Sequence, residues 1–122
     1  MATNTDYTLT PAAGQATQGN PQRAVGKVVF DSSSITAADY IEITVGFKPR
    51  RVRFVNLTDR IEVEWFEGMT ADTCLKTAAA GTRTLETTNK GITVGEKTFS
   101  VSQNATLAVI AASKDCYFEA WS

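Results

Sequence analysis

Residues 46–69, GFKPRRVRFVNLTDRIEVEWFEGM, constrain the fold of this chain more than any other segment. Side chains alternate between the two faces of a β-strand, and both halves of the segment follow that alternation. Val52 and Phe54 share one face in the first half, and Val63 and Trp65 share one face in the second. A helical period would scatter these four residues around the helix axis. The segment is therefore predicted to form a β-hairpin.

A turn centred on Thr58 and Asp59 sets the register of this hairpin. It predicts three cross-strand pairs: Val52 with Trp65, Phe54 with Val63, and Arg53 with Glu64. One face is then continuously apolar, and the other carries paired charges. An exposed ion pair contributes about 0 to 1 kcal/mol, so its expected use is register and solubility. A solvated sheet face is the simpler interpretation of these charges, and a partner-binding patch is the alternative.

The N-terminal segment, residues 1–24, differs in composition from the rest of the chain. It is rich in Thr, Ala, Gln, Asn and Gly, with Tyr7 and Leu9 as its large apolar residues. Such a segment cannot bury enough surface to order itself. We expect an extended or flexible arm that precedes a body formed by residues 25–122. Fully extended, the arm would span on the order of 80 Å, so it could reach a neighbouring molecule through Tyr7 and Leu9; a merely disordered terminus is the alternative.

From residue 25 onward, short strand-like segments alternate with turn residues. Outside the hairpin, strands are expected at residues 25–30, 40–45, 82–87, 92–94, 98–101, 106–112 and 116–121. Residues 70–81 fit either a short helix or a buried strand. About eight or nine short strands without an amphipathic helix of useful length predict an all-β domain, a β-sandwich of jelly-roll-like form. No repeat period that would indicate a propeller or solenoid is visible.

Length and charge limit the class of protein. A chain of 122 residues with 43% hydrophobic content suits one domain. Its 12 basic and 13 acidic residues give a formal net charge of −1, which provides no long-range field for nucleic acid or an anionic membrane. The N-terminus lacks the features of a secretory signal, and no apolar run approaches the roughly 20 residues of a membrane span. We expect no nucleic-acid partner, no membrane partner, and synthesis in a cytoplasm.

The sequence contains little that could support catalysis. The chain has no histidine, which removes the commonest general base and the commonest metal ligand. Four hairpin carboxylates lie close in sequence, but nothing indicates an apolar pocket that would raise the pKa of one of them. Cys74 and Cys116 match no zinc motif and are expected to be buried free thiols. The prediction is a non-enzymatic protein with no catalytic residue, metal site or cofactor.

The charged face of the hairpin is the part of the body best suited to contact a protein. Arg51 and Arg53 lie on that face by parity, and Phe66 lies there too, beside Val55. An exposed Phe66 would give a modest apolar patch that suits a protein partner. The candidate partner-binding residues are therefore Tyr7, Leu9, Arg51, Arg53 and Phe66.

Three phrases carry a family resemblance: residues 46–69, the Ala- and Thr-rich segment that follows, and GITVGEKTFSVSQNATLAVIAASKDCYFEAWS. They cover most of residues 40–122 and resemble small virion structural proteins of tailed bacteriophages. Within that group the chain is most similar to capsid decoration, or cement, proteins with a β-sandwich or jelly-roll body. The resemblance implies a location on the capsid surface of the virion and the major capsid protein as partner. It also implies stabilisation of the assembled head by bridging neighbouring subunits.

A cement protein gains from binding at several points at once, so we expect a homo-oligomer, a dimer or trimer. Two other functions remain open. A tail, neck or fibre-associated module of the phage particle would have a similar composition. A carbohydrate-binding β-sandwich would need two or three aromatic residues exposed on one face, where parity exposes Phe66 alone.

Overall fold

The computed structural model describes residues 7–13, 22–36 and 39–122, and for residues 7–13 it describes the backbone only. These residues form ten strands and no helix: β1 (Tyr7–Ala13), β2 (Arg23–Phe30), β3 (Tyr40–Thr44), β4 (Arg51–Asn56), β5 (Ile61–Phe66), β6 (Cys74–Thr77), β7 (Arg83–Glu86), β8 (Ile92–Val94), β9 (Thr98–Ser102) and β10 (Asp115–Trp121). No helix in the described part of the chain has the length and apolarity needed to cross a membrane.

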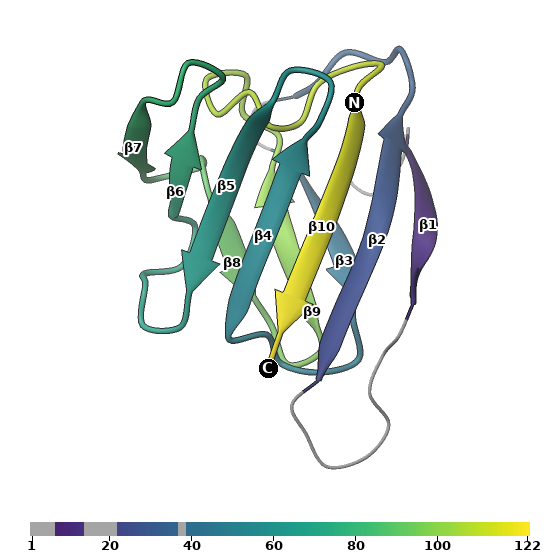
Figure 1. The fold of residues 1–122 in the computed structure, drawn as a ribbon, viewed down its shortest axis with the longest axis vertical. Coiled ribbons are helices and arrows are strands. Elements are labelled where there is room, and N and C mark those ends of the chain that lie inside the picture. The colour runs from purple at the N-terminus through teal and green to yellow at the C-terminus, as the bar shows by residue number, and fades with distance from the viewer. Residues whose placement is uncertain (1–6, 14–21, 37–38) are drawn as a thin grey trace.

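The strands form two antiparallel sheets that pack face to face (Figure 1). The larger sheet has the order β1-β2-β10-β4-β5-β6-β7, and the smaller has the order β3-β9-β8. The predicted all-β sandwich is confirmed. The chain crosses between the sheets four times, from β2 to β3, β3 to β4, β7 to β8 and β9 to β10. These crossings are the feature it shares with a jelly roll, while β4 to β7 form a simple meander.

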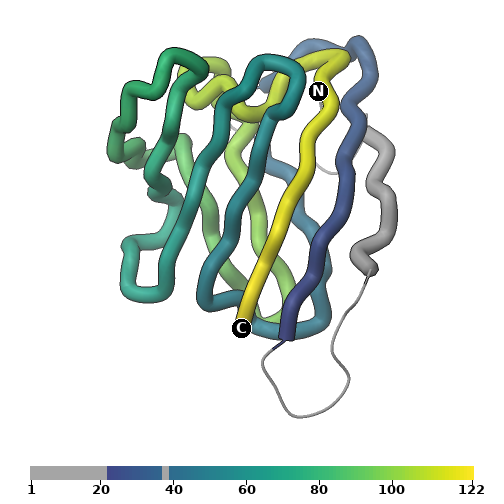
Figure 2. Tube along the Cα trace, viewed as in Figure 1, coloured from purple at the N-terminus to yellow at the C-terminus, as the bar shows by residue number. Residues whose placement is uncertain are grey.

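The C-terminal strand joins parts of the chain that are distant in sequence. β10 lies between β2 and β4, as the tube in Figure 2 shows. Phe118 of β10 packs against Phe99 of β9 in the smaller sheet, with ring centroids 5.5 Å apart and an interplanar angle of 61°. This edge-to-face contact connects the two sheets through the core. The last strand is therefore an interior strand of the larger sheet and also packs against the smaller sheet.

The β4–β5 hairpin has the predicted register. Val52 pairs with Trp65, Phe54 with Val63, and Arg53 with Glu64. Val52, Phe54 and Val63 are fully buried and Trp65 is 7% exposed, so the apolar face points inward as expected. The turn depends on Asn56, whose Oδ1 accepts a hydrogen bond from the Asp59 backbone N–H at 3.0 Å.

The ambiguous segment at residues 70–81 contains the strand β6, so the strand alternative holds and the helix does not. Within β6, Cys74 is buried and the other three residues are half-buried. Cys74 in β6 and Cys116 in β10 are both free and buried, which confirms the expectation for the thiols. Each sulfur donates a hydrogen bond to a backbone carbonyl, Cys74 to Lys90 at 3.3 Å and Cys116 to Val109 at 3.5 Å.

Residues 106–112 form a loop with a buried apolar side, and the strand expected there is wrong. Their large apolar side chains are fully buried: Leu107, Val109 and Ile110. The Asn104 side-chain Oδ1 accepts from the Thr106 N–H at 2.8 Å, and the Asn104 carbonyl accepts from the Ala108 N–H at 3.1 Å. Ala108 has a left-handed φ of 64°. The apolar run predicted burial correctly, but local hydrogen bonds at Asn104 turn the backbone out of the extended conformation.

Part of the expected arm of residues 1–24 is an extended strand of the larger sheet, β1. β1 pairs antiparallel with β2, placing Tyr7 opposite Phe30 and Leu9 opposite Val28. β2 itself begins at Arg23, and Ala24 is fully buried. Backbone pairing with the open edge of β2 orders this stretch without a large apolar side-chain content, which composition cannot reveal. Residues 1–6 and 14–21 of the expected arm lie outside the described residues.

Candidate functional site

The outer surface of the larger sheet is the main candidate site. We call it the arginine–aromatic face, and its central residues are Arg23, Lys27, Arg51, Arg53, Val55, Glu62, Glu64, Phe66, Tyr117, Glu119 and Trp121. They come from β2, β10, β4 and β5, which are adjacent in the larger sheet. Their side chains alternate with those that enter the core, such as Phe54 and Phe118.

One row of this face alternates cations and aromatic rings. Arg23, Trp121, Arg51 and Phe66 are successive cross-strand neighbours on β2, β10, β4 and β5. The Arg51 guanidinium carbon lies 4.6 Å from the Trp121 ring centroid and 5.4 Å from that of Phe66, and that of Arg23 lies 5.8 Å from Trp121. Each such contact contributes about 0.5 to 1 kcal/mol at an exposed site. The row therefore holds four long side chains in one arrangement.

A second pair of the same kind lies further along β10. The Lys27 ammonium nitrogen is 5.6 Å from the centroid of the Tyr117 ring, and the two residues are direct cross-strand partners. Tyr117 is 39% exposed and Phe66 is 42% exposed. Together with half-buried Trp121, they place three aromatic rings on one face.

Arginine–glutamate pairs occupy the middle of the face, and those between β4 and β5 run diagonally. Although Arg53 is opposite Glu64 in register, Arg53 pairs with Glu62, and Arg51 pairs with Glu64 at 2.9 Å. Arg53 also lies 3.9 Å from Glu119, its direct partner on β10. Diagonal neighbours are within reach of long side chains on adjacent strands. Hydrogen bonding to the Glu62 carboxylate raises the pKa of Arg53 above its ordinary value. These pairs fix the orientation of the arginines that also contact the aromatic rings.

Glu64 is the most buried acid of this face, with 8% exposure. Besides Arg51, it lies 3.6 Å from Arg83 on β7. A carboxylate at this depth needs such partners to offset its desolvation. Arg51 therefore has two functions in the sheet: it neutralises Glu64, and it packs between two aromatic rings.

A largely apolar hollow of about 320 Å³ adjoins the arginine–aromatic face, with which it shares Val55 and Glu62. It lies between the β4–β5 turn and the turn after β6, and its lining includes Val55, Leu57, Ala78 and Ala79. Leu57 is 55% exposed. The face thus combines charged, aromatic and aliphatic contacts, as protein-binding surfaces do.

The structure brings together three of the five residues singled out from the sequence. Arg51, Arg53 and Phe66 lie on the arginine–aromatic face. Tyr7 and Leu9 lie in β1, separated from β4 by β2 and β10. The sequence-based choice missed Trp121, Tyr117, Arg23 and Lys27. Parity in β10, where Cys116, Phe118 and Ala120 alternate with polar or aromatic residues, could have indicated the outward position of Tyr117 and Trp121.

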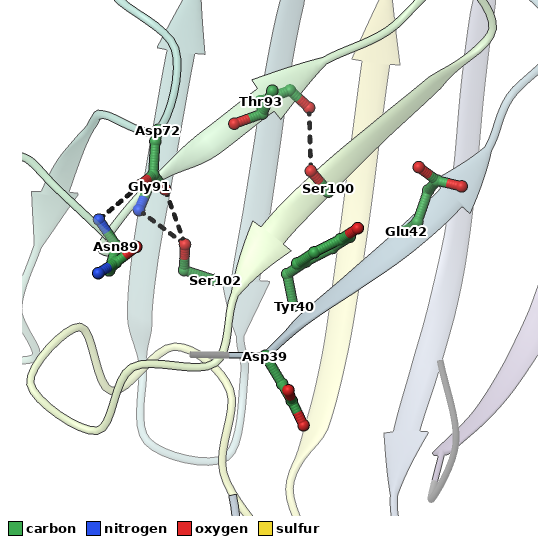
Figure 3. Close-up of a pocket in the computed structure, with 9 residues that line it drawn as sticks. All are labelled: Asp39, Tyr40, Glu42, Asp72, Asn89, Gly91, Thr93, Ser100 and Ser102. Atoms are coloured by element: carbon green, nitrogen blue, oxygen red, sulfur yellow. Dashed lines mark hydrogen bonds between the residues drawn. The ribbon is translucent and has the colours of Figure 1, made fainter. Parts of the chain in front are cut away.

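A second hollow, of about 460 Å³, lies on the outer side of the smaller sheet (Figure 3). It is lined by Asp39, Tyr40, Glu42, Asp72, Asn89, Gly91, Thr93, Ser100 and Ser102. Tyr40 and Glu42 lie on β3, next to Ser100 and Ser102 of β9. The described residues contain no group of three or more Cys, Asp or Glu side chains placed to hold a metal ion.

Comparison of the chain with protein-family models, with curated proteins and with solved structures finds no match.

Proposed function

We propose that this chain is a non-enzymatic decoration protein of a tailed-bacteriophage particle. In this proposal it binds the outer surface of the assembled head, contacts the major capsid protein, and bridges neighbouring subunits. The sequence resemblance suggests the phage particle, and the arginine–aromatic face is the observation that supports a protein-binding role. The virion surface is the corresponding location.

The composition of the arginine–aromatic face favours a protein partner. Arginine, tryptophan and tyrosine dominate the binding energy of protein interfaces, and this face presents all three on adjacent strands. Cation–aromatic contacts and ion pairs hold these side chains in place. Because the side chains are already ordered, binding costs less conformational entropy than it would for mobile side chains.

The same contacts argue against a carbohydrate platform on this face. The structure exposes three aromatic residues there, more than the single Phe66 expected by parity. However, guanidinium groups from both neighbouring strands, those of Arg23 and Arg51, lie over the Trp121 ring. A sugar would have to displace them before it could pack against Trp121. A protein surface can instead bind the arginines and the ring together.

Stabilisation of a head follows from mass action. A protein that binds the assembled shell, and not its separated subunits, stabilises the shell by about 2.7 kcal/mol per site when its free concentration is 100 times the Kd. A dimer or trimer of this chain would bind neighbouring sites at a high effective concentration. The proposal therefore includes a homo-oligomer as the active form.

Co-sedimentation tests this function. Purified chain is mixed with heads assembled from the major capsid protein of the same genome, and the pelleted chain is measured against its total concentration. Saturable binding at a fixed ratio to the major capsid protein is expected. Trp121→Ala should weaken binding by at least about tenfold, or 1.4 kcal/mol, whereas Tyr40→Ala on the opposite sheet should not.

Two results would overturn the proposal. One is a chain that stays in the supernatant at every concentration. The other is a chain that pellets with purified tails but not with heads, which would favour a tail, neck or fibre-associated module. If wild type and Trp121→Ala bind heads equally well, the chain is a head-binding protein whose contact lies outside the arginine–aromatic face.

A further inference from the structure

The hollow on the smaller sheet has no part in the proposed head contact. Its strand residues point away from the core: Tyr40, Glu42 and Thr93 are exposed, while Ile41, Ile43 and Phe99 are buried. It therefore opens on the side of the sandwich opposite the arginine–aromatic face. When the chain binds a head through the arginine–aromatic face, this hollow stays open to solvent.

One wall of the hollow is built by Asp72. Its carboxylate accepts hydrogen bonds from the Asn89 backbone N–H and, at 2.9 Å, from the Ser102 hydroxyl (Figure 3). The Ser102 oxygen also accepts from the Gly91 N–H at 3.3 Å. Asp72 thus holds the loop before β8 against β9, so the wall has a fixed shape before any ligand arrives.

Close packing at Gly91 makes this wall rigid. A Cβ atom on Gly91 would lie 2.3 Å from the backbone nitrogen of Thr73, and Thr73 forms a bridge with Ile92. The loop therefore packs directly against backbone, without an intervening side chain. A preformed wall of this kind lowers the entropy cost of binding.

The remaining lining groups surround an exposed aromatic ring with hydrogen-bonding groups. Tyr40 is 46% exposed, and Figure 3 shows its ring lying over the sheet between Ser100 and Asp39, with Glu42 beyond its hydroxyl end. Hydroxyl groups can donate and accept, the Asn89 amide can do both, and the carboxylates of Asp39 and Glu42 accept. The ring supplies an apolar surface among them.

The chemistry of this lining selects a ligand class. None of the described side chains that line the hollow is basic, and three are carboxylates, which disfavours an anion. The carboxylates among the described residues do not converge on a metal site. Because most lining groups are polar, a purely apolar ligand would leave them without partners at a cost. A neutral polyhydroxyl ring matches both the donors and acceptors and the aromatic surface.

We propose that this hollow is a binding site for a neutral saccharide. The Tyr40 ring packs against one sugar ring, the Glu42 carboxylate accepts hydrogen bonds from its hydroxyls, and the Asn89 amide contacts a further oxygen. Carboxylate acceptors form the stronger, charge-assisted hydrogen bonds. The hollow has the volume range of a small-ligand site. The inference does not depend on head binding, because it uses the opposite sheet.

Nuclear magnetic resonance titration of the full chain tests this site. Backbone amide shifts are followed while maltotriose, cellotriose, galactobiose or diacetylchitobiose is added to about 10 mM, which detects a Kd near 1 mM. At least one sugar is expected to shift amides of β3, β8 and β9 in a saturable manner. Tyr40→Ala should weaken that binding by at least about tenfold, and Glu42→Gln should also weaken it.

Tyr117→Ala is the matched control, because Tyr117 is a comparably exposed strand tyrosine on the opposite sheet. It should leave sugar binding unchanged. The proposal is overturned if none of the four sugars shifts these amides, or if the shifts map to other strands. It is also overturned if Tyr117→Ala and Tyr40→Ala have equal effects, or if lysine methyl ester, an organic cation, binds the hollow and the sugars do not. Spectra of Tyr40→Ala without sugar establish that the variant is folded.

Discussion

Alkaline pH should destabilise this protein through its two buried thiols. Burial raises the pKa of Cys74 from 9.0 to about 12, and burial does the same for Cys116. Neither residue has any exposed surface, and both sulfurs donate hydrogen bonds to carbonyls, which requires the protonated thiol. The folded state therefore keeps two protons that the unfolded state releases above pH 9.

The sign and size of the effect follow from proton linkage. A pKa that is raised on folding contributes stability that is fully present below the unfolded pKa and is lost as the pH rises toward the folded one. Here the window is pH 9 to about 12. Within that window each thiol lowers the free energy of unfolding by about 1.4 kcal/mol per pH unit. Between pH 8 and pH 10.5 the two thiols together should remove about 4 kcal/mol from the free energy of unfolding.

Urea unfolding in a phosphine reductant, at pH 8 and pH 10.5, measures this loss. The matched variant is Cys74→Ser with Cys116→Ser, because a serine hydroxyl can donate to the same carbonyls and does not titrate in this range. The two proteins differ only at the two thiols, so the difference between their pH dependences isolates them. Each single variant should recover about half of the effect. Identical pH dependence in wild type and double variant would refute the reasoning.

Four substitutions, one of them a control, test the packing by urea unfolding at neutral pH. Gly91→Ala should lower the free energy of unfolding by about 3 kcal/mol, because the new Cβ would clash with the Thr73 backbone. In the control Gly95→Ala the new Cβ meets mainly a movable threonine hydroxyl, so the loss should be less than about 1 kcal/mol. Equal losses in the two variants would count against this packing. Gln103 is fully buried and its amide has no hydrogen-bond partner among the described residues, so Gln103→Leu should stabilise by about 1 to 3 kcal/mol, and a loss of stability would show that the amide is satisfied. Trp65→Ala should cost about 3 to 5 kcal/mol, and a cost below about 1 would contradict its inward position.

The hairpin could be predicted to the residue because its information is local. Once a turn at residues 57–60 is assumed, the alternation of side chains gives each cross-strand pair. The predicted pairs were Val52–Trp65, Arg53–Glu64 and Phe54–Val63. The diagonal ion pairs did not follow. These ion pairs depend on the direction in which each long side chain extends between the strands. The register specifies only which backbone positions are opposite.

Other features depend on contacts that are distant in sequence. The order β2-β10-β4 joins the start, end and middle of the chain, so Trp121 could not be placed beside Arg23 and Arg51 in advance. The apolar run at residues 106–112 indicated burial, but its loop conformation is set by hydrogen bonds at Asn104. The hollow on the smaller sheet draws on separate segments from Asp39 to Ser102, and no single segment carries a recognisable motif.

Lysine footprinting on head-bound protein tests the central claim most directly. Lys27 lies on the arginine–aromatic face, whereas Lys97 is exposed in the turn before β9 of the other sheet. The chain is acetylated free and after co-sedimentation with heads, and labelling of each lysine is measured by mass spectrometry. The proposal requires Lys27 to be protected on heads while Lys97 labels as in the free protein. Protection of Lys97 with Lys27 still fully labelled, or no head-bound chain to label, would contradict it.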